Sequence, residues 1–152
     1  MSTSVQSHVN VTGEFIDLNG ERYYAIKNVD QMAPFFISLV SDSDHWMFLS
    51  SNTGLTAGRV SPDTALFTYE TVDRIHESHP HTGCKTLVKV LRDNQAQHWE
   101  PFNKEHDFRY KVTRNLYKNL LGNKICYEEI NHDLQVSFCY TWASSAEYGF
   151  IR

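Results

Sequence analysis

The feature that most constrains the fold is an alternation of large and small side chains over residues 134–142, LQVSFCYTW. A period of two places successive side chains on opposite faces of a β-strand, so one face is buried and the other is wetter. Trp142 is in phase with the large residues and is expected to fill the core. The preceding runs, 110–121 and 124–130, are also strand-like, which predicts an antiparallel meander.

Turn chemistry predicts further hairpins. Asn19-Gly20 separates the strand-like runs 14–18 and 21–26, and both turn positions favour positive φ. Counting outward from this turn pairs Ile16 with Tyr23 and Phe15 with Tyr24.

Two more strand pairs are expected in the middle of the chain. Residues 35–40 and 46–49 flank a polar loop at 41–45, and residues 85–91 and 97–102 flank a turn near Asp93-Asn94. Residues 71–76 read as a short helical turn. Residues 109–121 could also form a helix, although Tyr110, Val112 and Thr113 favour a strand. Short strands with turns at intervals of roughly 8–12 residues predict an all-β, antiparallel β-sandwich.

The length and net charge of the chain limit the class of protein that it can belong to. The 152 residues suit one domain, and the net charge of −4 comes without a basic stripe, so no nucleic-acid partner is expected. The longest apolar runs are too short to cross a membrane, and the N-terminus lacks the features of a signal peptide. We therefore expect a cytoplasmic protein with no membrane contact.

The chain divides into a polar, flexible N-terminal segment at 1–13 and a β-sandwich domain at 14–152. Residues 146–152 form a last strand signal, and the chain stops there without a polar tail. We therefore expect this domain to be the N-terminal fragment of a longer protein.

Three cysteines, Cys84, Cys126 and Cys139, have no metal-ligand spacing and are expected to be reduced core residues. A two-residue turn at His132-Asp133 would place Cys126 opposite Cys139 on neighbouring strands. Close thiols of this kind can oxidise during handling.

No motif predicts a cofactor or a catalytic residue. The string HESHPH at 76–81 resembles a metal site, but Pro80 interrupts regular structure and the string itself contains no cysteine, so solvated or structural histidines are expected. The segment 54–59, GLTAGR, lacks the lysine of a phosphate-binding loop and the third glycine of a dinucleotide fingerprint. No Gly-x-Ser-x-Gly elbow occurs in the sequence.

Carboxylates and tryptophans are the residue types that matter if the ligand is a sugar. The candidate acids are Asp42, Asp44, Glu100, Glu128 and Glu129, but Glu128 and Glu129 should point to opposite faces of a strand. Trp46, Trp99 and Trp142 could stack on sugar rings, and for Trp46 this reading has about the same weight as a core position.

The run MAPFFISLVSDSDHWMFLSSNTGLTAGRVSPDTALFTYETVDRIHES, followed by TGCKTLVKV, resembles the N-terminal region of large bacterial cellobiose-phosphorylase-like proteins. The resemblance covers residues 14 to 150, and its most specific part is SDSDHWMFLSSNTGLTAGR. It implies a β-sandwich similar to that of galactose mutarotase, with an (α/α)6 barrel beyond it that carries the general acid and the phosphate site. A complete sandwich in that family commonly has more strands than 152 residues supply, so an incomplete sandwich is expected.

The resemblance further implies a non-catalytic domain of a glycoside phosphorylase or hydrolase, one that packs on the barrel, helps to form a dimer and lends loop residues to an oligosaccharide. The candidate saccharide-binding residues are Asp44, His45, Trp46, Asn52 and Arg59. A buried turn with an Asp–Arg pair is an equally weighted reading of this segment.

Two alternatives stay open. A stand-alone mutarotase- or epimerase-like enzyme would use a histidine acid and a glutamate base, for which His45, His98 and Glu129 are the candidates. A carbohydrate-binding or dimerisation module would bind its ligand without turnover, and Trp46 would then be central.

Overall fold

The computed structural model describes residues 9–41, 43–145 and 149–152. The first eight residues of the predicted flexible segment lie outside this range, as do Asp42 and residues 146–148 of the predicted last strand. The first strand begins at Thr12, within the segment that was expected to be flexible.

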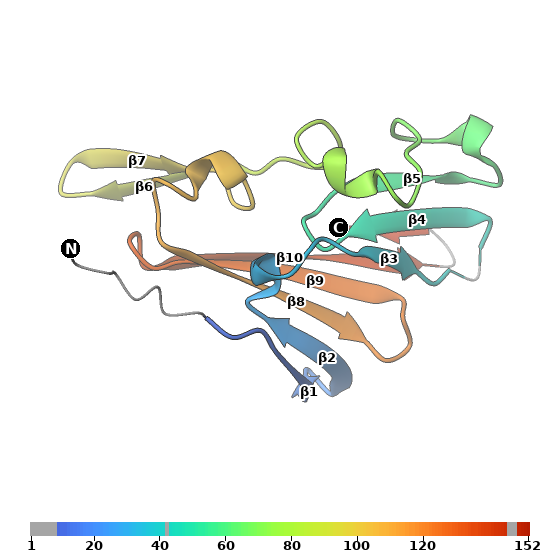
Figure 1. The fold of residues 1–152 in the computed structure, drawn as a ribbon, viewed down its shortest axis with the longest axis horizontal. Helices are drawn as coiled ribbons and strands as arrows, with labels where there is room; N and C mark the ends of the chain where they lie inside the picture. Colours follow the sequence, from blue (N-terminus) through green and yellow to red (C-terminus); the bar gives the residue numbers. More distant parts are fainter. Residues whose placement is uncertain (1–8, 42, 146–148) are drawn as a thin grey trace, which may run out of the picture.

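The protein consists of antiparallel strands in two layers (Figure 1). One layer is a six-stranded sheet in the order β1-β2-β8-β9-β10-β11, with the bounds Thr12–Leu18, Glu21–Lys27, Val112–Asn119, Lys124–Asn131, Val136–Ser145 and Gly149–Ile151. The other layer holds the sheet β3-β4-β5, with bounds Phe36–Leu39, His45–Ser50 and Leu55–Arg59, and the hairpin of β6 (Val88–Arg92) and β7 (Gln95–Trp99). The prediction of an all-β antiparallel sandwich is confirmed.

The described residues contain no α-helix, only four 3-10 segments, η1 to η4, at Val29–Gln31, Pro62–Thr64, Ile75–Glu77 and Lys104–His106. η3 overlaps the helical turn predicted at 71–76. None of the described helical segments is long and apolar enough to cross a membrane.

The main core lies between the six-stranded sheet and β3-β4-β5. Alternate residues of each sheet face inward, and the buried set comprises Val29, Ile37, Leu39, Met47, Leu49, Leu55, Ala57, Phe102, Leu116, Ile125, Tyr127 and Trp142. Each fully buried large apolar side chain contributes about 1.5–3 kcal/mol to stability. Tyr127 also joins the layers through a polar contact, because its hydroxyl donates to the Ser50 carbonyl at 2.8 Å. Trp142 occupies the core as predicted.

A second cluster fixes the β6–β7 hairpin over the same sheet. Its buried members are Trp99, Tyr110 and Leu134, and half-buried valines of β6 pack against them. The Tyr110 hydroxyl donates to the His98 carbonyl at 2.8 Å, which ties β7 to the segment that leads into β8.

The hairpins predicted at Asn19-Gly20 and Asp93-Asn94 form, and the first has the predicted register. Asn19 and Gly20 have φ values of 52° and 79°, and Ile16 pairs with Tyr23. Asp93 and Asn94 likewise have positive φ, at 49° and 61°, and connect β6 to β7. These turns match the twist of the flanking strands, which explains why Asn and Gly or Asp and Asn occur there.

The turn between β9 and β10 differs from the prediction. Asn131 pairs with Val136, so the turn contains four residues instead of two. The Asn131 side chain accepts the Leu134 N–H at 2.9 Å, and Gln135 has a φ of 54°, which together stabilise the longer turn. This side-chain bond to a nearby backbone group is typical of Asn in turns.

The longer turn shifts the register, so the predicted cysteine pairing is wrong. Cys126 lies opposite Thr141, and Cys139 lies opposite Glu128. All three cysteines are free, but Cys84 and Cys139 are exposed and Cys126 is half-buried. The predicted core placement of Cys84 and Cys139 is therefore wrong as well.

Candidate functional site

The predicted saccharide-binding residues lie at opposite ends of the β4–β5 hairpin. Asp44, His45, Trp46 and Arg59 are at the open end, where His45 pairs with Arg59 and Trp46 with Gly58. Asn52 is in the tight turn at the other end, roughly 20 Å away at 3.3 Å per residue along β4. The structure therefore brings four of the five residues together and separates Asn52 from them.

Asn52 has a structural role in this turn. Its side-chain oxygen accepts the Ser50 hydroxyl, and its amide donates to the His76 carbonyl at 2.9 Å. These contacts hold η3 against the end of β4. Asn52 therefore has little capacity left for a ligand.

The open end presents different residues on its two faces. Met47 and Leu49 of β4 point into the core, so Trp46 and Phe48 point outward, while His45 and Arg59 are on the inward-facing side at its rim. His45 Nδ1 lies 2.9 Å from the Ser43 hydroxyl, and Arg59 is exposed. His45 and Arg59 therefore border the outer face without belonging to it.

Four aromatic rings form a continuous row on the outer face of β3-β4-β5. The ring centroids are 5.3 Å apart for Phe36 and Phe48, 5.8 Å for Phe48 and Trp46, and 6.0 Å for Trp46 and Tyr69. Phe36 and Tyr69 are 42% and 46% exposed, and the two central rings are half-buried. We call Phe36, Phe48, Trp46 and Tyr69 the aromatic strip.

Sequence reasoning identified only Trp46 of this strip. The i, i+2 spacing of Trp46 and Phe48 within a strand was a usable signal, because such residues share a face. Phe36 comes from the neighbouring strand, and Tyr69 comes from an irregular segment that no strand pattern places.

Trp46 packs closely over Gly58, its partner on β5. A Cβ atom at Gly58 would lie 2.5 Å from Trp46 Cζ2 and 2.8 Å from both Ala65 Cα and the Thr64 carbonyl oxygen. The Trp46 Nε1–H is buried and donates to no other described residue, which is uncommon for an indole. Gly58 thus permits both the position of the indole and the close approach of the segment that follows η2.

We expect Gly58→Ala to destabilise the protein by about 1–3 kcal/mol and to displace Trp46, because two of the three contacts involve backbone atoms that cannot turn aside. Urea unfolding monitored by tryptophan fluorescence measures both effects. Gly13→Ala is the matched control, since its added Cβ would meet only the half-exposed Tyr24 ring. Equal stability of the two variants would contradict this account of Gly58.

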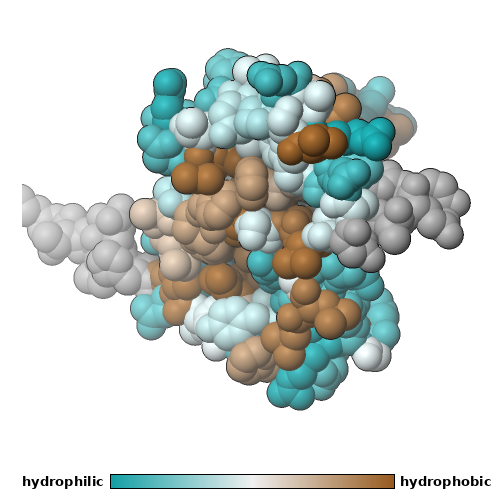
Figure 2. Space-filling model, turned by 90° about the vertical axis from the view of Figure 1, so that its right-hand side faces the viewer, coloured by the Kyte–Doolittle hydropathy of each residue, from teal (hydrophilic) through white to brown (hydrophobic). Residues whose placement is uncertain are grey.

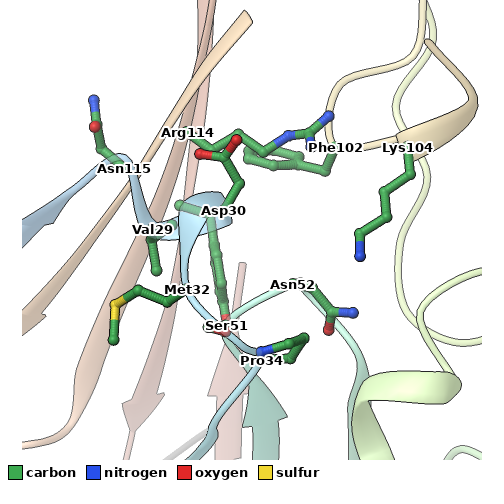
Figure 3. Close-up of a pocket in the computed structure, with 11 residues that line it drawn as sticks. Val29, Asp30, Met32, Pro34, Ser51, Asn52, Phe102, Lys104, Arg114 and Asn115 are labelled. Carbon is green, nitrogen blue, oxygen red and sulfur yellow. The ribbon is translucent and has the colours of Figure 1, made fainter. Parts of the chain in front are cut away.

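A separate small pocket lies beside η1 (Figure 3). Asp30 of η1 and Lys104 of η4 lie on opposite sides of it, with Ser51, Asn52 and Pro34 toward the bottom of the view. Its volume of about 40 Å³ holds roughly three or four water molecules, since one water needs about 10–15 Å³. The pocket is therefore too small for a sugar ring.

Arg114, in the wall of this pocket, belongs to a buried ionic network. Its Nε donates to Glu129 at 2.6 Å, and its terminal nitrogens donate to Asp107 at 2.5 and 3.3 Å. Burial by itself would lower the pKa of Arg114, but the bonds to Asp107 and Glu129 outweigh it, and the pKa is raised. Arg114 is thus a fixed, fully charged group of the core.

Glu129 is fully buried in the same network. Its carboxylate accepts the Trp99 indole N–H at 2.8 Å and the Phe102 backbone N–H at 2.7 Å, besides the Arg114 bond. Glu128, the next residue, faces the other side of the sheet and accepts from Asn115 at 2.7 Å and Tyr117 at 2.5 Å. The two carboxylates therefore diverge, as the strand pattern predicted.

The structure does not bring together the proposed acid and base of a sugar epimerase. His98 precedes Trp99 on β7, and because Trp99 points at Glu129, His98 points to the other face and is exposed. His45 lies on β4, in the other sheet of this layer. Glu129 already accepts three hydrogen bonds, which suits a structural carboxylate better than a general base.

The histidines of the HESHPH string do not form a metal site. His79 is buried, and its Nδ1 lies 2.7 Å from the Thr53 hydroxyl. Burial lowers the pKa of His79 to about 4, and the positive charges of Lys85 and Arg114 add to the shift. Within the described part of the chain, no three His, Cys, Asp or Glu side chains are placed to hold a metal ion.

Compared with known proteins, the chain matches no protein-family model and no curated sequence. The functional conclusion therefore depends on the geometry of the aromatic strip and of the buried polar groups.

Proposed function

We propose that this chain is a non-catalytic β-sandwich domain of a carbohydrate-active enzyme, and that the aromatic strip contacts the oligosaccharide. The observation that carries the proposal is the row of four adjacent rings on the outer face of β3-β4-β5. Flat aromatic faces pack against the apolar faces of sugar rings, while polar edges remain wet. A contiguous row of aromatic rings that is exposed at both ends and half-buried at its centre suits a binding surface.

The rim of the strip adds polar groups that suit sugar hydroxyls. Asp44 and Arg59 are exposed at the open end of the hairpin, where Arg59 pairs with His45, the residue before Trp46. Arg59 can donate several hydrogen bonds in a fixed geometry. These residues would set orientation, and the rings would supply most of the contact area.

The finer parts of the proposal come from the sequence resemblance. The parent protein would be a cytoplasmic glycoside phosphorylase or hydrolase, acting on β-linked glucosides in an (α/α)6 barrel that this domain supports. A stand-alone epimerase receives less support, because Glu129 is engaged in the core and His98 faces away from it.

Isothermal titration of the protein with a panel of gluco-oligosaccharides, in the presence of phosphate and with a product assay, tests the proposal. We expect binding without turnover, and a loss of about fivefold in affinity for Trp46→Ala, since one stacked ring contributes on the order of 1 kcal/mol. Phe108→Ala is the matched control, because Phe108 is 99% exposed and belongs to no ring cluster with the strip. Turnover, or equal affinity of the two variants, would overturn the proposal.

A further inference from the structure

A groove separates the edge of β3 from the inner face of β2 and β8. It has a volume of about 530 Å³, and its lining residues are Tyr24, Ile26, Phe35, Phe36, Ile37, Ser38, Leu116, Lys118, Asn119, Leu120 and Gly122. Figure 2 faces the end of the molecule that carries the β8–β9 turn and shows apolar surface gathered there between hydrophilic residues. The upper layer thus ends at β3, whereas the six-stranded sheet continues to β2 and β1.

The groove side of β3 presents backbone groups for pairing. The Ser51 N–H donates to the Phe35 carbonyl, so Phe35 and every second residue after it direct their backbone groups toward β4. Phe36 and Ser38 therefore direct theirs into the groove. The hydrogen bond from Lys118 Nζ to the Ser38 carbonyl, at 3.0 Å, agrees with this alternation.

The stretch of β3 whose backbone groups are available for pairing is short. Beyond Ser38, the Val40 N–H donates to the Gly122 carbonyl at 2.8 Å, and the Ser144 hydroxyl donates to the Val40 carbonyl at 2.6 Å. The β8–β9 turn therefore closes one end of the groove. The N–H and C=O of Phe36 and the N–H of Ser38 have no partner among the described residues, so they can pair with an incoming strand.

One cation on the groove floor has no counter-ion among the described residues. Lys118 is half-buried, and among the described residues its ammonium has only the Ser38 carbonyl as a hydrogen-bond partner. Burial lowers the pKa of Lys118, as expected for an ammonium without a counter-ion. None of the described residues that line the groove is acidic.

We propose that this groove binds an extended segment of a partner polypeptide, which adds a strand to the edge of β3 and places a carboxylate on Lys118. The strand would pair with the backbone of Phe36 and Ser38, and its alternate apolar side chains would cover Tyr24 and Ile26. The carboxylate supplies the charge that the groove lacks.

A second copy of the chain is a poorer occupant. Two β3 strands paired edge to edge would bring Phe36, Ile37, Ser38 and Leu39 to the groove, and none of these carries a negative charge. Lys118 would then become more buried without a counter-ion, which is costly. Charge complementarity therefore favours a partner strand with an acidic residue.

Two peptides test strand addition to β3 and the role of the carboxylate. Both are blocked seven-residue peptides of alternating valine and threonine; one has a central aspartate, and its twin has asparagine at the same position. The readouts are the amide signals of Phe36 and Ser38 in NMR titrations, with dissociation constants taken from the same data. We expect both signals to shift, and the aspartate peptide to bind about fivefold or more tightly than its twin, in line with a partly buried ion pair. In Lys118→Gln this preference should vanish while the twin still binds.

Ser38→Pro blocks strand addition directly, since it removes an N–H that points away from β4 and leaves the β3–β4 ladder intact. Loss of peptide binding in this variant, with an unchanged circular dichroism spectrum, supports the proposal. Unshifted Phe36 and Ser38 signals in the wild type, or equal affinity for the two peptides, overturns it. A wild-type dimer in sedimentation that Ser38→Pro dissociates also overturns it, in favour of a second copy. The saccharide titration does not bear on any of these outcomes.

Discussion

Glu129→Ala is expected to destabilise the protein by about 3–5 kcal/mol, because it leaves buried donors without an acceptor. The Trp99 indole and the Phe102 N–H lose their partner, and Arg114 keeps only Asp107. All three donors lie between the β6–β7 hairpin and the six-stranded sheet, so the hairpin should loosen first. Urea unfolding, followed by circular dichroism and tryptophan fluorescence, measures the change.

Glu128→Ala is the control on the neighbouring position. Glu128 is half-buried on the opposite face and accepts from Asn115 and Tyr117, so its loss should cost about 1 kcal/mol. If the two variants unfold at the same urea concentration, Glu129 is not the centre of the network.

Acidification from pH 7 to pH 4 is expected to destabilise the protein through His79 by roughly 2–3 kcal/mol. Burial holds the pKa of His79 at about 4 in the folded state, against 6.5 for an unperturbed histidine. Between these values the unfolded chain binds more protons than the folded one, so stability falls as the pH falls. The contribution of neutral His79 is fully present above pH 6.5 and is lost as the pH passes through 4.

His79→Gln isolates this contribution from that of other titrating groups. Its amide does not titrate and can replace the hydrogen bond to the Thr53 hydroxyl. The difference in unfolding free energy between wild type and variant, measured at pH 7 and at pH 4, should change by the stated amount. If the difference in unfolding free energy is the same at both pH values, the pKa of His79 is the same in the folded and the unfolded protein, and this account of His79 is wrong.

Local turn chemistry and strand periodicity were enough to predict much of the fold. Asn19-Gly20 and Asp93-Asn94 determine their hairpins because few other residues accept positive φ at both turn positions. The alternation from Val136 to Trp142 identified the buried face of β10, since a strand has only two faces. These features depend on neighbours in the sequence.

One local side-chain bond and several contacts between distant residues were missed. The four-residue turn after Asn131 forms because the Asn131 side chain bonds to the Leu134 N–H, and the resulting register places Cys126 diagonal to Cys139 instead of directly opposite it. The aromatic strip needs Tyr69 from an irregular segment to lie against Trp46. Glu129 could be read as a catalytic base because only the fold shows how many donors surround it.

The most direct test of the aromatic strip uses the indole N–H signals of the three tryptophans in an NMR titration with a β-linked gluco-oligosaccharide. Trp99 donates to Glu129 and Trp142 is in the core, so both should keep their positions, whereas Trp46 is at the centre of the strip. We expect the Trp46 signal to shift in a saturable manner while the other two stay unchanged. An unchanged Trp46 signal, with binding detected elsewhere or not at all, would contradict the assignment of the aromatic strip as the saccharide site.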